Sequence, residues 1–175
     1  MDDIEQLKIN RAPVMTLWAA TVAMRMGFDH GEALTLGRAV AGMNAQSKGR
    51  RLGIIEATPE SLRELRHDNP NGRHQVRLLH RLVPVLVTDD GVRALDKGKA
   101  TDPASVEKYL ASKFGKHREI AERAMSALAL NFSPTELAEV SYALYEKFRP
   151  EIPEGVTGWG AKGILDMATI RNDSP

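Results

Sequence analysis

Four basic residues in the first third of the chain have the chemistry to contact phosphate groups. Arg38 lies in a segment with helical spacing, and Lys48, Arg50 and Arg51 follow it in the sequence Ser-Lys-Gly-Arg-Arg. Arginine and lysine hydrogen-bond phosphate oxygens and neutralise their charge, and the intervening glycine lets a backbone come close to such a group. The four residues predict a nucleic-acid-binding site for DNA or RNA. The alternative is a solvated basic loop with no ligand.

The distribution of charge favours the same kind of partner. The whole chain has a net charge of +1, but residues 8–81 contain twelve Lys/Arg against six Asp/Glu, a net charge of +6. A basic half of a protein attracts polyanions. A solvated surface with unevenly placed charges gives the same count, so both interpretations stay open.

The other reactive side chains form no recognisable catalytic set. His67, His74 and His80 are seven and six residues apart, spacings that match neither a helical i,i+4 metal pair nor a strand pair with an acidic partner. If the protein is a small enzyme, its site must collect His74, His80, Asp89 and Lys162 in one pocket. The sequence predicts no metal, no cofactor and no particular catalytic residue, so a non-enzymatic binding protein is the favoured class.

The composition indicates a single domain in a reducing compartment. A chain of 175 residues with 42% hydrophobic residues can bury a sizeable core, and it contains no cysteine. The N-terminal sequence MDDIEQ has no basic or apolar region typical of a signal peptide. The apolar residues 12–28 are too few for a bilayer span. We therefore predict a cytoplasmic protein with no membrane contact.

Residues 13–51 are predicted to organise the fold. Apolar side chains at helical spacing predict a central helix that begins near Pro13 and ends at Gly27. Asp29 and Glu32 predict a capping box for a second helix, which extends to about Ser47.

Small residues mark one face of this second helix. Ala33, Gly37 and Ala41 are four residues apart, a pattern that lets another backbone pack closely. The neighbour is either a helix of the same chain or a second copy, so a structural or interaction module that forms a homodimer is the alternative function.

The rest of the chain is predicted to add helices and one small β-hairpin. Alternating valines and Asp90-Gly91 predict a hairpin near residues 83–95, and Pro84 predicts an edge position for its first strand. Residues 76–82 fit a strand or a helix equally well. Further helices are predicted at residues 58–67, after Asp102, over residues 116–130 and after a capping box at Ser133.

These elements predict a mainly α fold with a single compact domain of about six helices. Residues 1–10 are expected to form a loose, helical lead-in, and residues 150–175 a Pro/Gly-rich tail that packs on the body through Trp159 and ends in a short turn. No internal repeat is present in the sequence.

Residues 19–38, aligned on Gly27, resemble the helix-turn-helix of bacterial repressors. Apolar residues occupy its buried positions and Ala23 its small position. The resemblance implies that the second helix lies in a DNA major groove and presents Asp29, His30, Thr35 and Arg38 to the bases. It covers about twenty of the 175 residues, and the rest of the chain resembles no family that we recognise.

Overall fold

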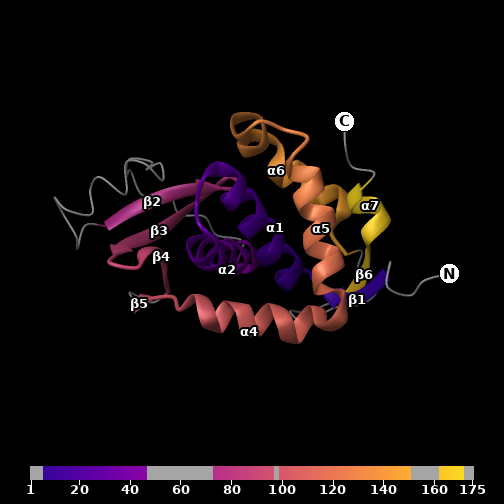
Figure 1. Cartoon of the computed structure of the whole chain (residues 1–175), viewed down its shortest axis with the longest axis horizontal. Helices are drawn as coiled ribbons and strands as arrows, with labels where there is room; N and C mark the ends of the chain where they lie inside the picture. The colour runs from indigo at the N-terminus through magenta and orange to yellow at the C-terminus, as the bar shows by residue number, and fades with distance from the viewer. Residues whose placement is uncertain (1–5, 47–72, 97–98, 151–161, 172–175) are drawn as a thin grey trace.

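Helix α1 forms the centre of the protein in the computed structural model, which describes residues 6–46, 73–96, 99–150 and 162–171 (Figure 1). Residues 13–23 of this helix are all buried. A helix that is apolar on nearly every side packs on every side, so the prediction of a central first helix is confirmed. The helices are α1 (Arg11–Met26), α2 (His30–Gln46), α4 (Pro103–Phe114), α5 (Arg118–Ala129), α6 (Pro134–Phe148) and α7 (Met167–Arg171), with a 3-10 turn at Gly115–His117.

A tight corner joins α1 to α2, as predicted. Gly27 has a φ of 116°, in the region that favours glycine, and closes α1 by donating its N–H to the Met24 carbonyl at 3.1 Å. The capping box is complete, because the Glu32 N–H donates to Asp29 Oδ1 at 2.8 Å and the Asp29 N–H donates to Glu32 Oε1 at 3.0 Å. The two helices therefore pack against each other directly after the turn.

Gly37 lies at the crossing of α1 and α2. A Cβ atom at this position would lie 2.3 Å from the Thr16 carbonyl oxygen and 2.9 Å from the Ala20 amide nitrogen. Both neighbours are backbone atoms that cannot move aside. The small-residue face of α2 is thus filled by α1 of the same chain, and Ala33 and Ala41 are buried beside Gly37.

The prediction of a mainly α fold with one hairpin is wrong, because the described residues form a mixed α/β fold with two antiparallel sheets. The predicted hairpin is present as β3 and β4, but it belongs to a four-stranded sheet in the order β2-β3-β4-β5. The undecided residues 76–82 form the end of one strand, a two-residue turn and the start of the next. The strands of this sheet are β2 (Arg73–Leu78), β3 (Arg81–Thr88), β4 (Gly91–Asp96) and β5 (Lys99–Ala100).

Strand β3 is central in this sheet, which corrects the edge position predicted from Pro84. The pairing of β3 with β4 runs from Thr88 opposite Gly91 to Val85 opposite Ala94 and ends there, one residue short of Pro84. Proline has no N–H to donate. It is tolerated in this strand because β4 no longer pairs with β3 at that point.

The second sheet joins the two ends of the described chain. Strand β1 (Gln6–Asn10) pairs antiparallel with β6 (Lys162–Asp166), and Leu7 lies opposite Leu165. The expected helical lead-in is therefore wrong for residues 6–10. Ile9 and Leu165 are buried, so each of the two strands turns an apolar side chain toward the core. The short C-terminal turn predicted over residues 164–170 is present only from Met167 onward, as α7, because residues 164–166 belong to β6.

Three side chains of α1, spaced seven residues apart, donate hydrogen bonds to backbone carbonyls. One of these carbonyls lies within α6, and the other two lie just beyond its ends. Seven residues are about two helical turns, so the three donors lie on one side of α1. This arrangement docks α6 antiparallel to α1. The pairs are Arg11 Nε to Pro150 O at 2.9 Å, Trp18 Nε1 to Ser141 O at 2.9 Å and Arg25 Nη2 to Phe132 O at 2.9 Å.

Helix starts elsewhere follow the sequence signals. Asp102 accepts a hydrogen bond from the Ala104 N–H at 3.0 Å and caps α4. Ser133 and Glu136 form both bonds of the predicted capping box at α6. The predicted helix at residues 58–67, the basic residues Lys48, Arg50 and Arg51, and Trp159 lie outside the described residues. Within the described ranges, no helix combines the length and the apolar character that crossing a bilayer requires.

Candidate functional site

Arg38 is the one member of the predicted nucleic-acid site that falls within the described residues. Its side chain is exposed, and its guanidinium carbon lies 4.8 Å from the centre of the Tyr109 ring on α4. This cation–π contact orients the side chain along the surface where α2 meets α4. The other three members, Lys48, Arg50 and Arg51, follow the end of α2 in the sequence.

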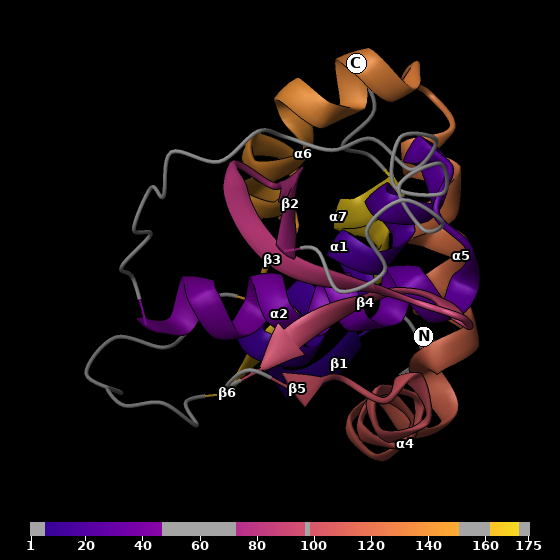
Figure 2. The ribbon, with the colours of Figure 1, turned by 90° about the vertical axis from the view of Figure 1, so that its left-hand side faces the viewer.

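Helix α2 is packed on several sides. It contacts α1, α4 and β4, and it lies behind the sheet in Figure 2. Of the positions that the helix-turn-helix resemblance assigns to base contacts, Asp29, His30 and Arg38 are exposed, whereas Thr35 has no exposed surface. A recognition helix needs a free face that fits a major groove, and over residues 30–42, where the burial of α2 is described, only His30 and Arg38 are exposed.

Two side chains of α2 bind the backbone of β4. Glu32 Oε2 accepts a hydrogen bond from the Val92 N–H at 2.9 Å, and Thr35 Oγ1 accepts one from the Ala94 N–H at 3.0 Å. The later residue of the helix binds the later residue of the strand. Helix α2 and strand β4 therefore run in the same direction, as Figure 2 also shows.

This shared direction places the C-terminal end of α2 at one particular end of the sheet. Strand β4 runs antiparallel to β3, so its last residues lie level with the start of β3. The turn between β2 and β3 is at that same end and contains His80, with Arg81 directly after it and Arg77 three residues before it. His80 and Arg77 are exposed and Arg81 is half-buried. We call these three residues the basic turn.

The two-residue turn between β2 and β3, which presents His80, has an unusual backbone. Leu79 and His80 both have positive φ, 48° and 63°, where glycine and asparagine are the usual residues. Leu79 is 2% exposed, so burial of its side chain offsets the strain of its backbone. The His80 ring lies 6.2 Å from the Tyr142 ring of α6 at an interplanar angle of 63°. The turn is thus held between the core and α6.

The structure does not bring together the residues proposed for an enzyme. His80 precedes β3 and Asp89 follows it, and a strand of eight residues separates them by about 25 Å. Lys162 belongs to the other sheet. His74 shares the side of β2 that carries the buried Val76, and His67 lies outside the described residues. In the part of the chain that the structure describes, no three His, Asp or Glu side chains gather as a metal site requires.

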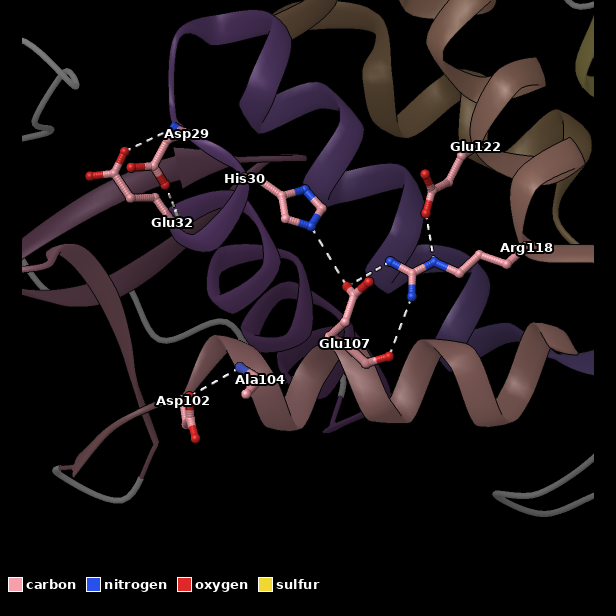
Figure 3. A network of polar contacts seen from close by, with 8 residues as sticks. All are labelled: Asp29, His30, Glu32, Asp102, Ala104, Glu107, Arg118 and Glu122. Atoms are coloured by element: carbon pink, nitrogen blue, oxygen red, sulfur yellow. Dashed lines mark hydrogen bonds and ion pairs between the residues drawn. The ribbon is translucent and has the colours of Figure 1, made fainter.

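Figure 3 shows a chain of ion pairs that links α2, α4 and α5. The Arg118 guanidinium binds Glu107 Oε2 at 2.7 Å and Glu122 Oε1 at 2.6 Å, and His30 Nε2 lies 3.6 Å from the same Glu107 oxygen. The hydrogen bond from Arg118 lowers the pKa of Glu107, against the opposing effect of partial burial. Burial by itself would lower the pKa of Arg118, but its bonds to the two carboxylates outweigh this and raise it. Arg118 thus has two carboxylate partners, and its bonds to Glu107 fasten α5 to α4.

Comparison of the chain with protein-family models, with curated proteins and with solved structures returned no match. The functional interpretation therefore rests on the residues themselves. Sequence reasoning missed the basic turn because Leu79-His80 has none of the residues that mark a two-residue hairpin turn. The signal that was present is two arginines four residues apart, Arg77 and Arg81, around a histidine.

Proposed function

We propose that the protein is a non-enzymatic nucleic-acid-binding protein whose interface is the end of the four-stranded sheet where α2 terminates. The observation that carries the proposal is the parallel run of α2 along β4, set by the bonds from Val92 to Glu32 and from Ala94 to Thr35. It puts the end of α2 at the end of the sheet that carries the basic turn.

The proposal adds the basic residues that follow α2 in the sequence. Lys48 follows Gln46, the last residue of α2, by two positions, and Arg51 follows it by five. Five residues of chain reach at most about 18 Å. In the proposal these basic residues, with Arg77 and Arg81, contact phosphates. Arg38 belongs to the margin of the interface because it lies over Tyr109 on the α4 side of α2.

The packing of α2 supports contact through this basic end rather than insertion of α2 into a major groove. The homodimer alternative loses its proposed surface, because α1 fills the face around Gly37. We also propose a cytoplasmic location, on the ground that the chain has no cysteine.

Salt-dependent binding tests the proposal. The full chain is titrated against labelled nucleic acid by fluorescence anisotropy at several salt concentrations. Binding that releases counterions weakens as salt increases, and each lost phosphate contact lowers the slope of the log–log plot by about 1. We expect Arg77→Ala, Arg81→Ala and a combined Lys48→Ala, Arg50→Ala, Arg51→Ala variant to lower this slope.

Arg123→Ala is the matched control. Arg123 is an exposed arginine on α5, with a side chain 74% exposed, and its ion pair is with Glu119 on the same helix. Its removal changes the net charge by the same amount as Arg77→Ala but leaves the interface intact. The proposal fails if no nucleic acid binds, if binding ignores salt, or if Arg123→Ala weakens binding as much as Arg77→Ala does.

A further inference from the structure

We infer that the nucleic acid at this interface is single-stranded, and that its bases stack on the rings of His80 and Tyr142. The inference rests on the proposed function and adds the class of nucleic acid that the site takes. Proteins that bind single strands combine cationic groups with aromatic rings on which unpaired bases stack, whereas the bases of a duplex are not available for stacking.

The two rings meet at the turn, and Arg77 and Arg81 flank that turn in the sequence on opposite faces of the sheet, since Arg81 pairs with Leu78. His80 is exposed, Tyr142 is half-buried, and they come from different elements, the turn between β2 and β3 and helix α6. Their interplanar angle of 63° means that they meet at an edge instead of stacking face to face. The two rings thus do not cover each other's faces, which is the arrangement that a stacking base requires.

The surroundings hold both rings in position before a ligand binds. Tyr142 lies against the buried Tyr145, with ring centres 6.2 Å apart, and Tyr145 packs on Phe148 at 5.9 Å. The buried Leu79 anchors the turn that presents His80. Because the rings are already ordered, stacking a base on them costs little side-chain entropy. A base can therefore use the full stacking energy.

The geometry also disfavours a duplex at this surface. Reading a duplex requires an element that enters a groove, and α2 is packed against α1, α4 and β4. The loop between β2 and β3 has only two residues, Leu79 and His80. Such a short turn suits contact with a flexible strand whose bases turn toward the protein.

The test compares a labelled oligothymidylate with a labelled duplex of the same length, at the same salt concentration. We expect the single strand to bind at least about tenfold more tightly. Tyr142→Leu and His80→Gly should each weaken binding of the single strand about tenfold and change duplex binding little. Glycine adopts a φ of 63° without strain, so His80→Gly preserves the turn.

Phe132→Leu is the matched control, since Phe132 is another half-buried aromatic residue but precedes α6 and lies ten positions from Tyr142 in the sequence. It should leave the affinity for the single strand unchanged, and circular dichroism verifies that all variants are folded. The inference is overturned if the duplex binds as tightly as the single strand, or if Tyr142→Leu and His80→Gly bind like the wild type while Arg77→Ala still weakens binding. In both cases the proposed function stands. If neither nucleic acid binds in a salt-dependent way, the proposed function itself fails.

Discussion

Glu32 Oε2 lies 2.9 Å from the amide nitrogen of Val92, sixty residues further along the chain, and accepts its hydrogen bond. The other oxygen of the same carboxylate accepts the Asp29 N–H and completes the capping box of α2. One side chain therefore closes a helix and covers part of the edge of a strand. Unpaired strand edges invite pairing with other chains, and α2 covers this edge of β4 with the side chains of Glu32 and Thr35.

Replacing Glu32 should destabilise the protein more than an ordinary cap mutation does. Glu32→Ala leaves the buried Val92 N–H without its acceptor, and a buried unsatisfied donor costs about 1–3 kcal/mol of unfolding free energy. Glu136→Ala is the matched control, because Glu136 has the same position in the capping box of α6 but is exposed. Urea denaturation should show a clearly smaller loss for Glu136→Ala. Equal losses would mean that the bond to β4 contributes nothing.

The two glycines of α2 should respond in opposite ways to alanine. Gly37→Ala places a methyl group against the backbone of Thr16 and Ala20 and should cost about 2–3 kcal/mol, because α1 and α2 must separate. Gly42 has nothing within 4 Å of an added Cβ, so Gly42→Ala should gain up to about 1 kcal/mol from helix propensity. Thermal denaturation of both variants checks the pair. A neutral Gly37→Ala would show that the crossing is looser than described.

Local signals in the sequence predicted the helices well. Asp29, Asp102 and Ser133 each precede a helix and accept a backbone hydrogen bond at its start. These capping bonds join residues two or three apart, so a short window of sequence contains the whole interaction. The close packing at Gly37 also followed from sequence, because a glycine inside a helix needs compensation from packing.

The sheets were mostly missed for the opposite reason. Pairing of β1 with β6 brings together residues more than 150 positions apart, and nothing in Gln6–Asn10 indicates its partner. The turn at Leu79-His80 lacks glycine and asparagine, since it is stabilised by burial of Leu79 and by Tyr142. Contacts between distant segments outweigh local preference at both places.

Little of the candidate site followed from the sequence. Arg38 and the basic residues after it were found by charge, but the basic turn lies in a segment whose structure was undecided. Its position at the end of α2 depends on Glu32 and Thr35 binding β4, and no local pattern encodes that arrangement.

Tyr145 should make stability fall at high pH. Burial raises the pKa of Tyr145 to about 12, with nearby Arg11 and Arg149 opposing the shift, whereas the unfolded chain has the ordinary value of 10.0. The folded state favours the neutral phenol, so this contribution to stability is complete below pH 10.0 and is lost as the pH rises toward 12. Tyr145→Phe keeps the ring contacts and removes the ionisation. Urea denaturation above pH 10.0 should therefore show a flatter loss of stability for Tyr145→Phe. Parallel curves for the two proteins would contradict the assignment.

Glu107 should make stability fall in acid. Its hydrogen bond from Arg118 lowers its pKa below the ordinary 4.5, so its contribution is complete above pH 4.5 and is lost as the pH falls through the lower folded-state value. The Glu107 side chain is 47% exposed, and solvent screening limits the effect to under about 1 kcal/mol. Thermal denaturation should show that Glu107→Gln is less stable than the wild type at neutral pH and that the difference shrinks in acid.

Glu119→Gln separates this effect from general acid destabilisation. Glu119 pairs with Arg123 on the surface of α5, and both side chains are more than 70% exposed. Exposed pairs contribute little, so Glu119→Gln should follow the wild type at every pH. Glu136 contributes a remaining acid dependence in all three proteins, because hydrogen bonds with Ser133 lower its pKa as well. If Glu107→Gln also follows the wild type throughout, then the Glu107 carboxylate adds no stability, and Arg118 binds α4 through the Glu107 carbonyl, which accepts from its Nη1 at 3.3 Å.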